Sequence, residues 1–220
     1  MTEDPSRADV RATYERIGSH FSKTREYAWP EVESFVDEYG TDGVALDVGC
    51  GNGRHSELLA DTADRVVALD ASRELLLAAR DRLSGTQVAI LQGDATTLPM
   101  RSESVDVAVY VATLHHLPTT EARRASLDEL ARVLTPDGRA LVSAWSTAHD
   151  RFDASADADT GFDTTVDWTL PGGEVVDRFY HIHAPAEFKR TITDSALALH
   201  SFELSSGNCY AVVRPEGKRP

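Results

Sequence analysis

A glycine-rich loop has the residue types and spacing best suited to hold a ligand. The segment from Asp47 to Gly53 reads Asp-Val-Gly-Cys-Gly-Asn-Gly and lies between an apolar run and a helical pattern. Glycines at such a junction permit a tight turn and let a ligand approach the backbone. The Lys-Ser/Thr pair of a phosphate-binding loop is absent, and the spacing differs from the G-x-G-x-x-G of dinucleotide-binding proteins. This spacing, with the acid at Asp47, favours S-adenosylmethionine as the ligand near Gly49, Gly51 and Gly53.

Further candidates for the cofactor site stand at the ends of neighbouring elements. Asp70 ends the second apolar run, where a carboxylate can accept both ribose hydroxyls; the alternative is a helix cap, a role that Ser72 can fill by itself. Asp94 and Ala95 follow the third run, near the expected adenine edge, although Asp94 could instead form an Asx turn. Arg54 opens the first helix after the loop, either as a solvated side chain or as a contact to a cofactor or substrate carboxylate.

The elements that must position these residues follow from the hydrophobic pattern. From Val44 onward, short apolar runs alternate with helical patterns, which predicts a parallel sheet with helices on both faces. The predicted strands are 44–48, 66–69, 88–91, 105–111 and 140–144, and the predicted helices are 54–60, 72–83 and 121–134. Strands at 199–204 and 209–213 form a terminal hairpin. We therefore expect an α/β, Rossmann-like class I methyltransferase fold, a seven-stranded, mostly parallel sheet with a terminal β-hairpin.

Two regions depart from this alternation. Residues 1–40 are predicted to form a helical N-terminal cap, because apolar residues such as Tyr14, Ile17 and Phe21 recur at three- and four-residue spacing. Residues 146–176 are rich in Asp, Ala, Thr and Gly, with few aromatic residues, and are predicted to be a long insertion. A strand at 178–183 and a helix from Pro185 follow. At 220 residues and 41% hydrophobic content, residues 1–220 are expected to form one domain.

The charge composition is typical of a protein adapted to high salt. The formal net charge is −14, and only 3 of the 22 basic residues are lysines. At about 1 M salt the Debye length is roughly 3 Å, so the repulsion within an acidic surface is screened. The acidic balance is therefore weak evidence against a nucleic-acid partner.

The remaining composition argues for a cytoplasmic protein without a membrane partner. No run of about 18 apolar residues occurs, and the N-terminus lacks the apolar core of a signal peptide. The two cysteines, Cys50 and Cys209, can supply neither a disulfide framework nor a four-ligand zinc set, so no metal is expected.

Several motifs outside the glycine loop carry a resemblance to a known family. They are the segment from Tyr14 to Arg25, Trp29-Pro30, His115-His116-Leu117, Trp145, Trp168 and the segment from Arg178 to His181. Together with the loop, they resemble the tRNA wobble-uridine carboxymethyl methyltransferases over nearly the whole chain. The resemblance implies methyl esterification of a carboxymethyl group on uridine in tRNA, in a complex with a small zinc-binding activator protein.

A carboxylate acceptor sets simple demands on the site. It is ionised at pH 7, so methyl transfer requires alignment of its oxygen with the methyl carbon and no general base. The site does need a cation, and Arg25 and Arg178 are the candidates, because a guanidinium binds a carboxylate through two parallel hydrogen bonds. The alternative is that they form ion pairs with neighbours such as Glu26 and Asp177.

Histidines and aromatic residues are the other candidates for contact with the acceptor. His115 and His116 follow the fourth strand, where the Asn-Pro-Pro-Tyr of amine-directed methyltransferases is absent, and at least one is expected to face the acceptor. Tyr180, His181 and Trp168 could stack on a uracil, or could form an aromatic core beneath the insertion.

The predicted sheet also has an edge that a partner could cover. The strand from Val88 to Leu91 is expected at the edge, beside a helix that carries Leu75, Leu76 and Leu77. Strand addition would satisfy such an edge, and the activator of the resembled family binds in this way. The alternative is that these leucines pack beneath the sheet.

Two other functions stay open at this point. The same enzyme class could act on a small-molecule carboxylate or a quinone-like acceptor. A non-enzymatic scaffold that binds the cofactor and stabilises a partner is the third possibility.

Overall fold

A seven-stranded sheet is the centre of the molecule. The computed structural model describes residues 5–154 and 157–217. The strand order is β3-β2-β1-β4-β5-β9-β8. The strands are β1 (Val44–Val48), β2 (Arg65–Asp70), β3 (Ala89–Gln92), β4 (Val105–Tyr110), β5 (Leu134–Trp145), β8 (Leu197–Ser205) and β9 (Asn208–Pro215). The first five pair in parallel, whereas β9 pairs antiparallel with β5 and β8. This arrangement confirms the predicted sheet and its terminal hairpin.

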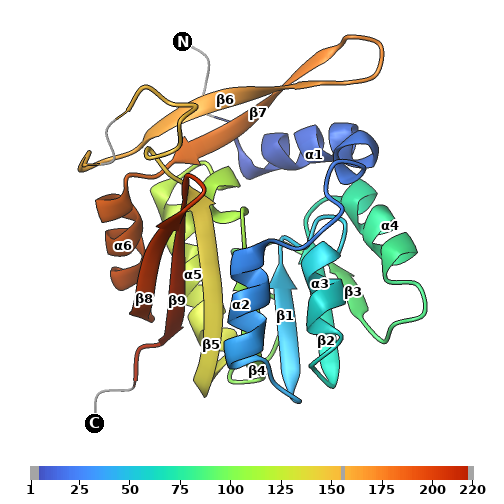
Figure 1. Cartoon of the computed structure of the whole chain (residues 1–220), viewed down its shortest axis with the longest axis vertical. Helices are drawn as coiled ribbons and strands as arrows, with labels where there is room; N and C mark the ends of the chain where they lie inside the picture. Colours follow the sequence, from blue (N-terminus) through green and yellow to red (C-terminus); the bar gives the residue numbers. More distant parts are fainter. Residues whose placement is uncertain (1–4, 155–156, 218–220) are drawn as a thin grey trace.

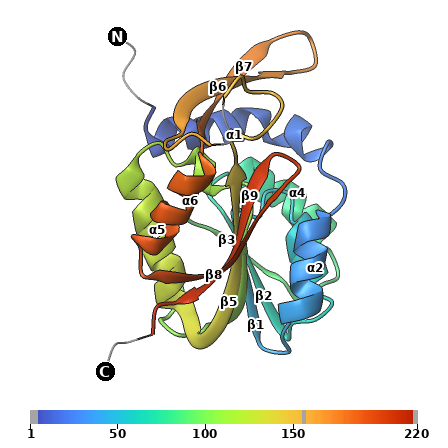
Figure 2. The ribbon, with the colours of Figure 1, turned by 60° about the vertical axis from the view of Figure 1, so that its left-hand side comes forward.

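Helices cover both faces of the sheet, and Figure 2 shows α5 and α6 on one side and α2 on the other. The helices are α1 (Arg7–Ser22), α2 (Pro30–Tyr39), α3 (Arg54–Leu59), α4 (Arg73–Arg82), α5 (Thr120–Val133) and α6 (Pro185–Thr193), with a 3-10 turn η1 (Leu114–His116). Because the central parallel strands are covered on both faces, β1 and β4 are buried almost throughout.

The predicted helical cap divides into two helices with different roles. α1 lies across the carboxyl ends of the parallel strands (Figure 1), and Ser6 and Asp9 form a capping box at its start. In α2, Val32, Phe35 and Val36 are buried against the sheet at three- and four-residue spacing. Only α1 therefore caps the sheet, while α2 is part of the core.

The predicted insertion contains a strand that the sequence did not indicate. β6 (Phe162–Thr169) pairs antiparallel with β7 (Val175–Ile182) in a separate two-stranded sheet above α1 (Figure 1). Gly172 and Gly173 turn the chain with φ of 102° and 88°, values that glycine adopts without strain. The segment predicted to be an insertion thus contains a strand that was not predicted, and the strand predicted at 178–183 begins earlier, at Val175. Residues 155–156 lie outside the described part.

Two further features concern the helices and the cysteines. No helix within the described residues is long and apolar enough to cross a membrane. Cys50 and Cys209 are both buried and form no disulfide.

Candidate active site

Two adjoining cavities open at the carboxyl ends of the strands. The larger cavity has a volume of about 620 Å³ and lies between the glycine loop, α1 and the ends of β2 and β3. The smaller cavity, of about 160 Å³, lies between the loop, the α1–α2 connection and β7. Gly49, Gly51, Phe21, Ala112 and His116 line both cavities. A ligand in one cavity would therefore be separated from a ligand in the other only by this shared wall.

The loop has a backbone shape that side chains would prevent. Gly49 has a φ of 72°, and a Cβ there would lie 2.2 Å from Thr113 Oγ1. Gly51 has a φ of 56°, and a Cβ there would meet no atom within 4 Å, because the position faces open space. Gly53, with a φ of 80°, precedes α3 and packs on Leu83. Gly49 and Gly51 thus form the cavity surface, whereas Gly53 supports the loop from below.

Asp47 also acts beneath the loop. It is 1% exposed, lines neither cavity and accepts a hydrogen bond from Ser56 Oγ at 2.6 Å. Burial raises the pKa of Asp47 to about 7, although the Ser56 hydrogen bond opposes the shift. Its place is therefore structural, one layer below the surface where a ligand could bind.

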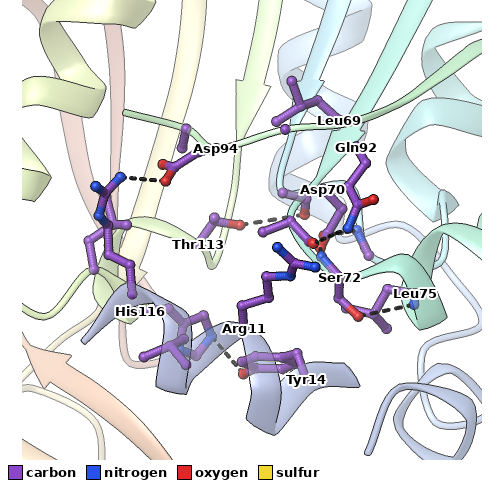
Figure 3. A pocket seen from close by; sticks show the side chains of 18 of the residues that line it. Arg11, Tyr14, Leu69, Asp70, Ser72, Leu75, Gln92, Asp94, Thr113 and His116 are labelled. Atoms are coloured by element: carbon purple, nitrogen blue, oxygen red, sulfur yellow. Dashed lines mark hydrogen bonds and ion pairs between the residues drawn. The ribbon is translucent and has the colours of Figure 1, made fainter. Parts of the chain in front are cut away.

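Asp70 stands in the larger cavity with both oxygens directed by the backbone (Figure 3). Its Oδ2 accepts from the Gly51 N–H at 2.9 Å and its Oδ1 from the Ser72 N–H at 2.8 Å. The Ser72 hydroxyl accepts from the Leu75 N–H, so Ser72 caps α4 and Asp70 does not. Burial raises the pKa of Asp70 to about 6, against the two backbone hydrogen bonds. Each carboxylate oxygen keeps a lone pair for a ligand hydroxyl.

Asp94 and Ala95 line the same cavity near β3. Asp94 Oδ1 accepts from the Thr96 N–H at 2.8 Å, which is the Asx turn that the sequence left open as an alternative. Its other oxygen forms an ion pair with Arg7 of α1. Both oxygens of Asp94 thus have protein partners.

Residues of α1 complete the larger cavity, and the sequence interpretation missed them. Arg7, Arg11 and Tyr14 line the cavity from positions i, i+4 and i+7, which share one helix face. Figure 3 shows Tyr14 beside His116, across the cavity from Ser72. Glu15 fixes the helix by accepting from the backbone N–H groups of Arg73 and Glu74 at the start of α4. The spacing of polar residues on this face was the available signal.

The smaller cavity is lined by three arginines and by no aspartate or glutamate. Arg178 is 6% exposed, and its Nη1 donates to Tyr180 Oη at 2.6 Å. Its Nε is buried without a hydrogen-bond partner, and no carboxylate pairs with it among the described residues. Asp177 precedes Arg178 in β7, so its side chain lies on the opposite face of the strand. The Arg178–Asp177 ion pair, which was the alternative role for Arg178, therefore does not form. An uncompensated guanidinium in a cavity is a receptor for an anion.

Arg25 and Arg54 lie at the same cavity on aromatic supports. The Arg25 guanidinium lies 4.6 Å from the Phe21 ring centroid, and that of Arg54 lies 4.7 Å from Trp29. Burial lowers the pKa of both groups, and the charge of Arg25 contributes to a pKa of about 10 for Arg54. Both remain cationic at neutral pH.

His115 and His116 have different hydrogen-bond capacities. His115 Nδ1 accepts from the backbone N–H of Trp145 at 3.0 Å, so the proton of the neutral ring is on Nε2. His116 Nδ1 donates to the Phe179 carbonyl at 3.0 Å, and its Nε2 accepts from the Tyr14 hydroxyl at 2.8 Å. Burial lowers the pKa of His115 well below its usual value and that of His116 to about 3. Only His115 can donate to a ligand.

Successive residues of β7 face opposite sides of the strand, so its aromatic candidates differ in whether they reach the cavity. Tyr180 lines the smaller cavity together with Trp145, at a ring separation of 4.8 Å. His181 faces the other way and is held between Asp163 Oδ1 and Glu187 Oε1. Trp168 donates to His20 and packs under the Arg178 guanidinium. The structure thus brings Tyr180 to the cavity and keeps His181 away from it.

The edge strand lies where the sequence indicated, but its helix is oriented differently. β3 is at the end of the sheet, and Leu91 is 37% exposed. Leu75 and Leu76 are buried, and Leu75 lines the larger cavity. Leu75 and Leu76 therefore pack within the molecule and are not a surface for a partner. Leu77, the third leucine of this run, is half-buried.

Comparisons with known proteins agree with this geometry. A family model described as a methyltransferase domain matches residues 46–142. A putative methyltransferase of Encephalitozoon cuniculi is 30% identical over 217 residues, which cover 96% of this chain and 99% of the relative. The chain belongs to the S-adenosylmethionine-dependent methyltransferases.

Within that class, a relative of known substrate is also similar. The tRNA (carboxymethyluridine(34)-5-O)-methyltransferase of Mus musculus is 36% identical over 137 residues, which are 62% of this chain. The chain spans only 20% of the length of that relative. A solved complex of the Haloferax volcanii Trm112 methyltransferase activator with a putative methyltransferase has a TM-score of 0.65 at 14% identity, covering 96% of this chain and 99% of that one. This likeness concerns the fold alone.

Proposed function

We propose that this protein esterifies the carboxymethyl group of a modified wobble uridine in tRNA, with S-adenosylmethionine as the methyl donor. The observation that carries the proposal is the Arg178 guanidinium. Its Nη1 donates to Tyr180 Oη, its Nε has no hydrogen-bond partner, and Arg178 lines a cavity that no aspartate or glutamate lines. A guanidinium without a counter-charge can bind a carboxylate through two parallel hydrogen bonds. The mouse relative, whose name includes carboxymethyluridine, supports the choice of acceptor.

The larger cavity fits the cofactor. Its volume of about 620 Å³ is within the usual range for ligand pockets, about 300–1,000 Å³. Asp70 can accept the ribose hydroxyls, and Gly51 leaves open space beside them. When bound in this cavity, with Asp70 at its ribose, S-adenosylmethionine would supply an electrophilic methyl group for transfer to the acceptor oxygen.

The histidines support an acceptor that is already ionised. His116 uses both ring nitrogens within the protein, and His115 has only an N–H to offer. Neither ring is available as a general base toward the acceptor, and a carboxylate needs none. His115 Nε2–H instead orients the carboxylate that Arg178 binds.

The partner and the uracil belong to the same proposal. Tyr180 and Trp145 provide aromatic surface on which the base can stack. A small activator protein adds a strand to β3, as the exposed Leu91 and the free edge allow. The Haloferax volcanii complex, which contains an activator, supports this part of the proposal.

Two experiments test the proposed reaction. In cells that lack the protein, mass spectrometry of wobble nucleosides should show the carboxymethyl form and no methyl ester; unchanged ester content would contradict the proposal. In the purified enzyme, Arg178→Gln should lower kcat/KM for carboxymethyluridine RNA about 100-fold, since a bidentate charged contact contributes about 3 kcal/mol. Its affinity for S-adenosylhomocysteine should be unchanged. Arg65→Gln, at the exposed opposite end of β2, is the matched control.

A further inference from the structure

The mouth of the smaller cavity contains two cations that the carboxylate does not require. Arg25 and Arg54 line this cavity and are half-buried, whereas Arg178 is buried, and their guanidinium groups lie over the rings of Phe21 and Trp29. Arg54 Nη1 donates to the Tyr27 carbonyl, and Arg25 Nη1 donates to both the carbonyl and the hydroxyl of Thr24. Most donors of both guanidinium groups therefore remain available.

Arg25 and Arg54 form no ion pair in the described part of the chain, although the protein carries a net charge of −14. The charge of Asp47 opposes the lowering of the Arg54 pKa from beneath the loop, but Asp47 lines neither cavity. The neighbouring Glu26 carboxylate interacts with the Tyr27 hydroxyl and raises the pKa of that tyrosine. Two adjacent arginines without an ion-pair partner favour an anionic ligand.

A buried nitrogen without a partner and an exposed aromatic ring also occur near these arginines. His55 is 5% exposed and lines the same cavity, and its Nε2 is buried without a hydrogen bond. A buried polar atom without a partner is costly unless a ligand satisfies it. Tyr27 is 75% exposed, and its carbonyl accepts a hydrogen bond from Arg54. An exposed aromatic ring thus belongs to the residue that Arg54 contacts.

We propose that Arg25 and Arg54 bind the phosphodiester next to the acceptor uridine, and that Tyr27 stacks on the adjoining base. This inference rests on the proposed RNA substrate and adds a second contact region to it. Single-stranded RNA is bound by such combinations of guanidinium groups and aromatic rings. The chemistry required is an anionic oxygen group, which the carboxylate of the cofactor could also provide, so the experiment must separate these two sources.

The test compares two acceptors with the same reactive group. One is the carboxymethyluridine nucleoside, which has no phosphate, and the other is a single-stranded oligonucleotide with that residue inside. With the full chain and its activator, Arg54→Gln should lower kcat/KM about tenfold more on the oligonucleotide than on the nucleoside. The slope of log(kcat/KM) against log[salt] for the oligonucleotide should decrease by about 0.7, the contribution of one phosphate.

A second variant controls for a possible loss of folding in Arg54→Gln. Tyr27→Ala alters an exposed side chain and should reduce kcat/KM roughly tenfold on the oligonucleotide only. The control, Arg65→Gln, should leave both reactions and the salt slope unchanged. An unaltered oligonucleotide reaction in Arg54→Gln and Tyr27→Ala would overturn the inference. Equal losses on both acceptors with weaker binding of S-adenosylhomocysteine would also overturn it, since the anion would then be the cofactor carboxylate.

A separate measurement distinguishes failure of this inference from failure of the proposed function. If the wild-type enzyme methylates neither acceptor, the proposed reaction is wrong. Fluorescence anisotropy with an unmodified uridine oligonucleotide still tests the phosphate site. Binding about tenfold weaker in Arg54→Gln than in wild type would support the site, and equal binding would overturn it.

Discussion

Two buried carboxylates on neighbouring strands have different tasks. Asp47 lies under the glycine loop with a serine hydroxyl as its partner, while Asp70 presents its carboxylate to the larger cavity. Burial raises the pKa of both, and only Asp70 has backbone N–H groups on both oxygens. Asp47 therefore supports the glycine loop from beneath, whereas Asp70 is available to bind a ligand.

Removing the Asp70 carboxylate should weaken cofactor binding. Asp70→Ala should raise the Kd for S-adenosylhomocysteine at least tenfold, because the ribose hydroxyls lose an ionic acceptor. Calorimetric titration measures the change, and Asp94→Ala, whose wild-type carboxylate is already paired with Arg7, should have a smaller effect. Equal Kd values for wild type and Asp70→Ala would contradict this assignment.

The Asp47 carboxylate should make stability depend on pH. Its pKa is about 7 in the folded protein against an ordinary value of 3.8, so between these values the folded state alone holds the proton. Its contribution to the unfolding free energy therefore decreases as pH rises from about 4 to 7. The unfolding free energy of Asp47→Asn should exceed that of wild type by about 4 kcal/mol at pH 8 and match it at pH 4, since one pKa unit corresponds to about 1.4 kcal/mol. Urea unfolding at both pH values measures this, and a gap that is independent of pH would contradict it.

α1 is the element on which both cavities depend. It supplies the outer wall of the larger cavity, and Phe21 near its end reaches the smaller one. Tyr14 ties it through His116 to β7, Glu15 ties it to α4, and Arg16 forms an ion pair with Glu174 of the β6–β7 connection. Any shift of α1 would therefore change both cavities together.

Loosening α1 should affect binding more than folding. Glu15→Ala leaves two N–H groups at the start of α4 without acceptors, which should lower the unfolding free energy by about 1 kcal/mol. We expect KM for the cofactor to rise several-fold at nearly constant kcat. Glu15→Gln, which keeps one acceptor oxygen, should restore part of the change; identical kinetics in all three proteins would show that α1 is held by other contacts.

The sequence predicted the elements better than the orientation of their side chains. Apolar runs located β1, β2 and β4, because central parallel strands are buried on both faces. β6 was missed, because its Asp and Thr residues resemble a loop and its pairing with β7 is the only evidence for it. Tyr180 and His181 are adjacent in sequence, and strand register alone decides which of them faces the cavity.

Charge is distributed unevenly over the whole molecule. The chain has 36 acidic and 22 basic residues, yet the smaller cavity is lined by three arginines and by no aspartate or glutamate. An acidic surface around a basic cavity keeps the long-range potential negative and makes anion binding a short-range property of the site. Such a protein should depend on salt for its stability.

The salt dependence can be measured directly. The thermal midpoint should rise by several degrees between 0.05 M and 2 M KCl, because screening reduces repulsion among surface acids. The double variant Glu33→Gln and Asp37→Asn removes two exposed acids of α2 and should show a smaller rise. A midpoint that does not change with KCl would contradict the assignment of a high-salt protein.

The shared wall of the two cavities has a practical consequence for inhibition. Gly49 and Gly51 are part of this wall, and neither adds a side chain to it. A bisubstrate compound, with an adenosine portion joined through a short linker to a carboxylate, could occupy both cavities at once. The second contact would then be intramolecular, so the affinity should exceed that of either fragment by orders of magnitude. Bulkier residues at position 51 would confer resistance, but they would also block methyl transfer itself.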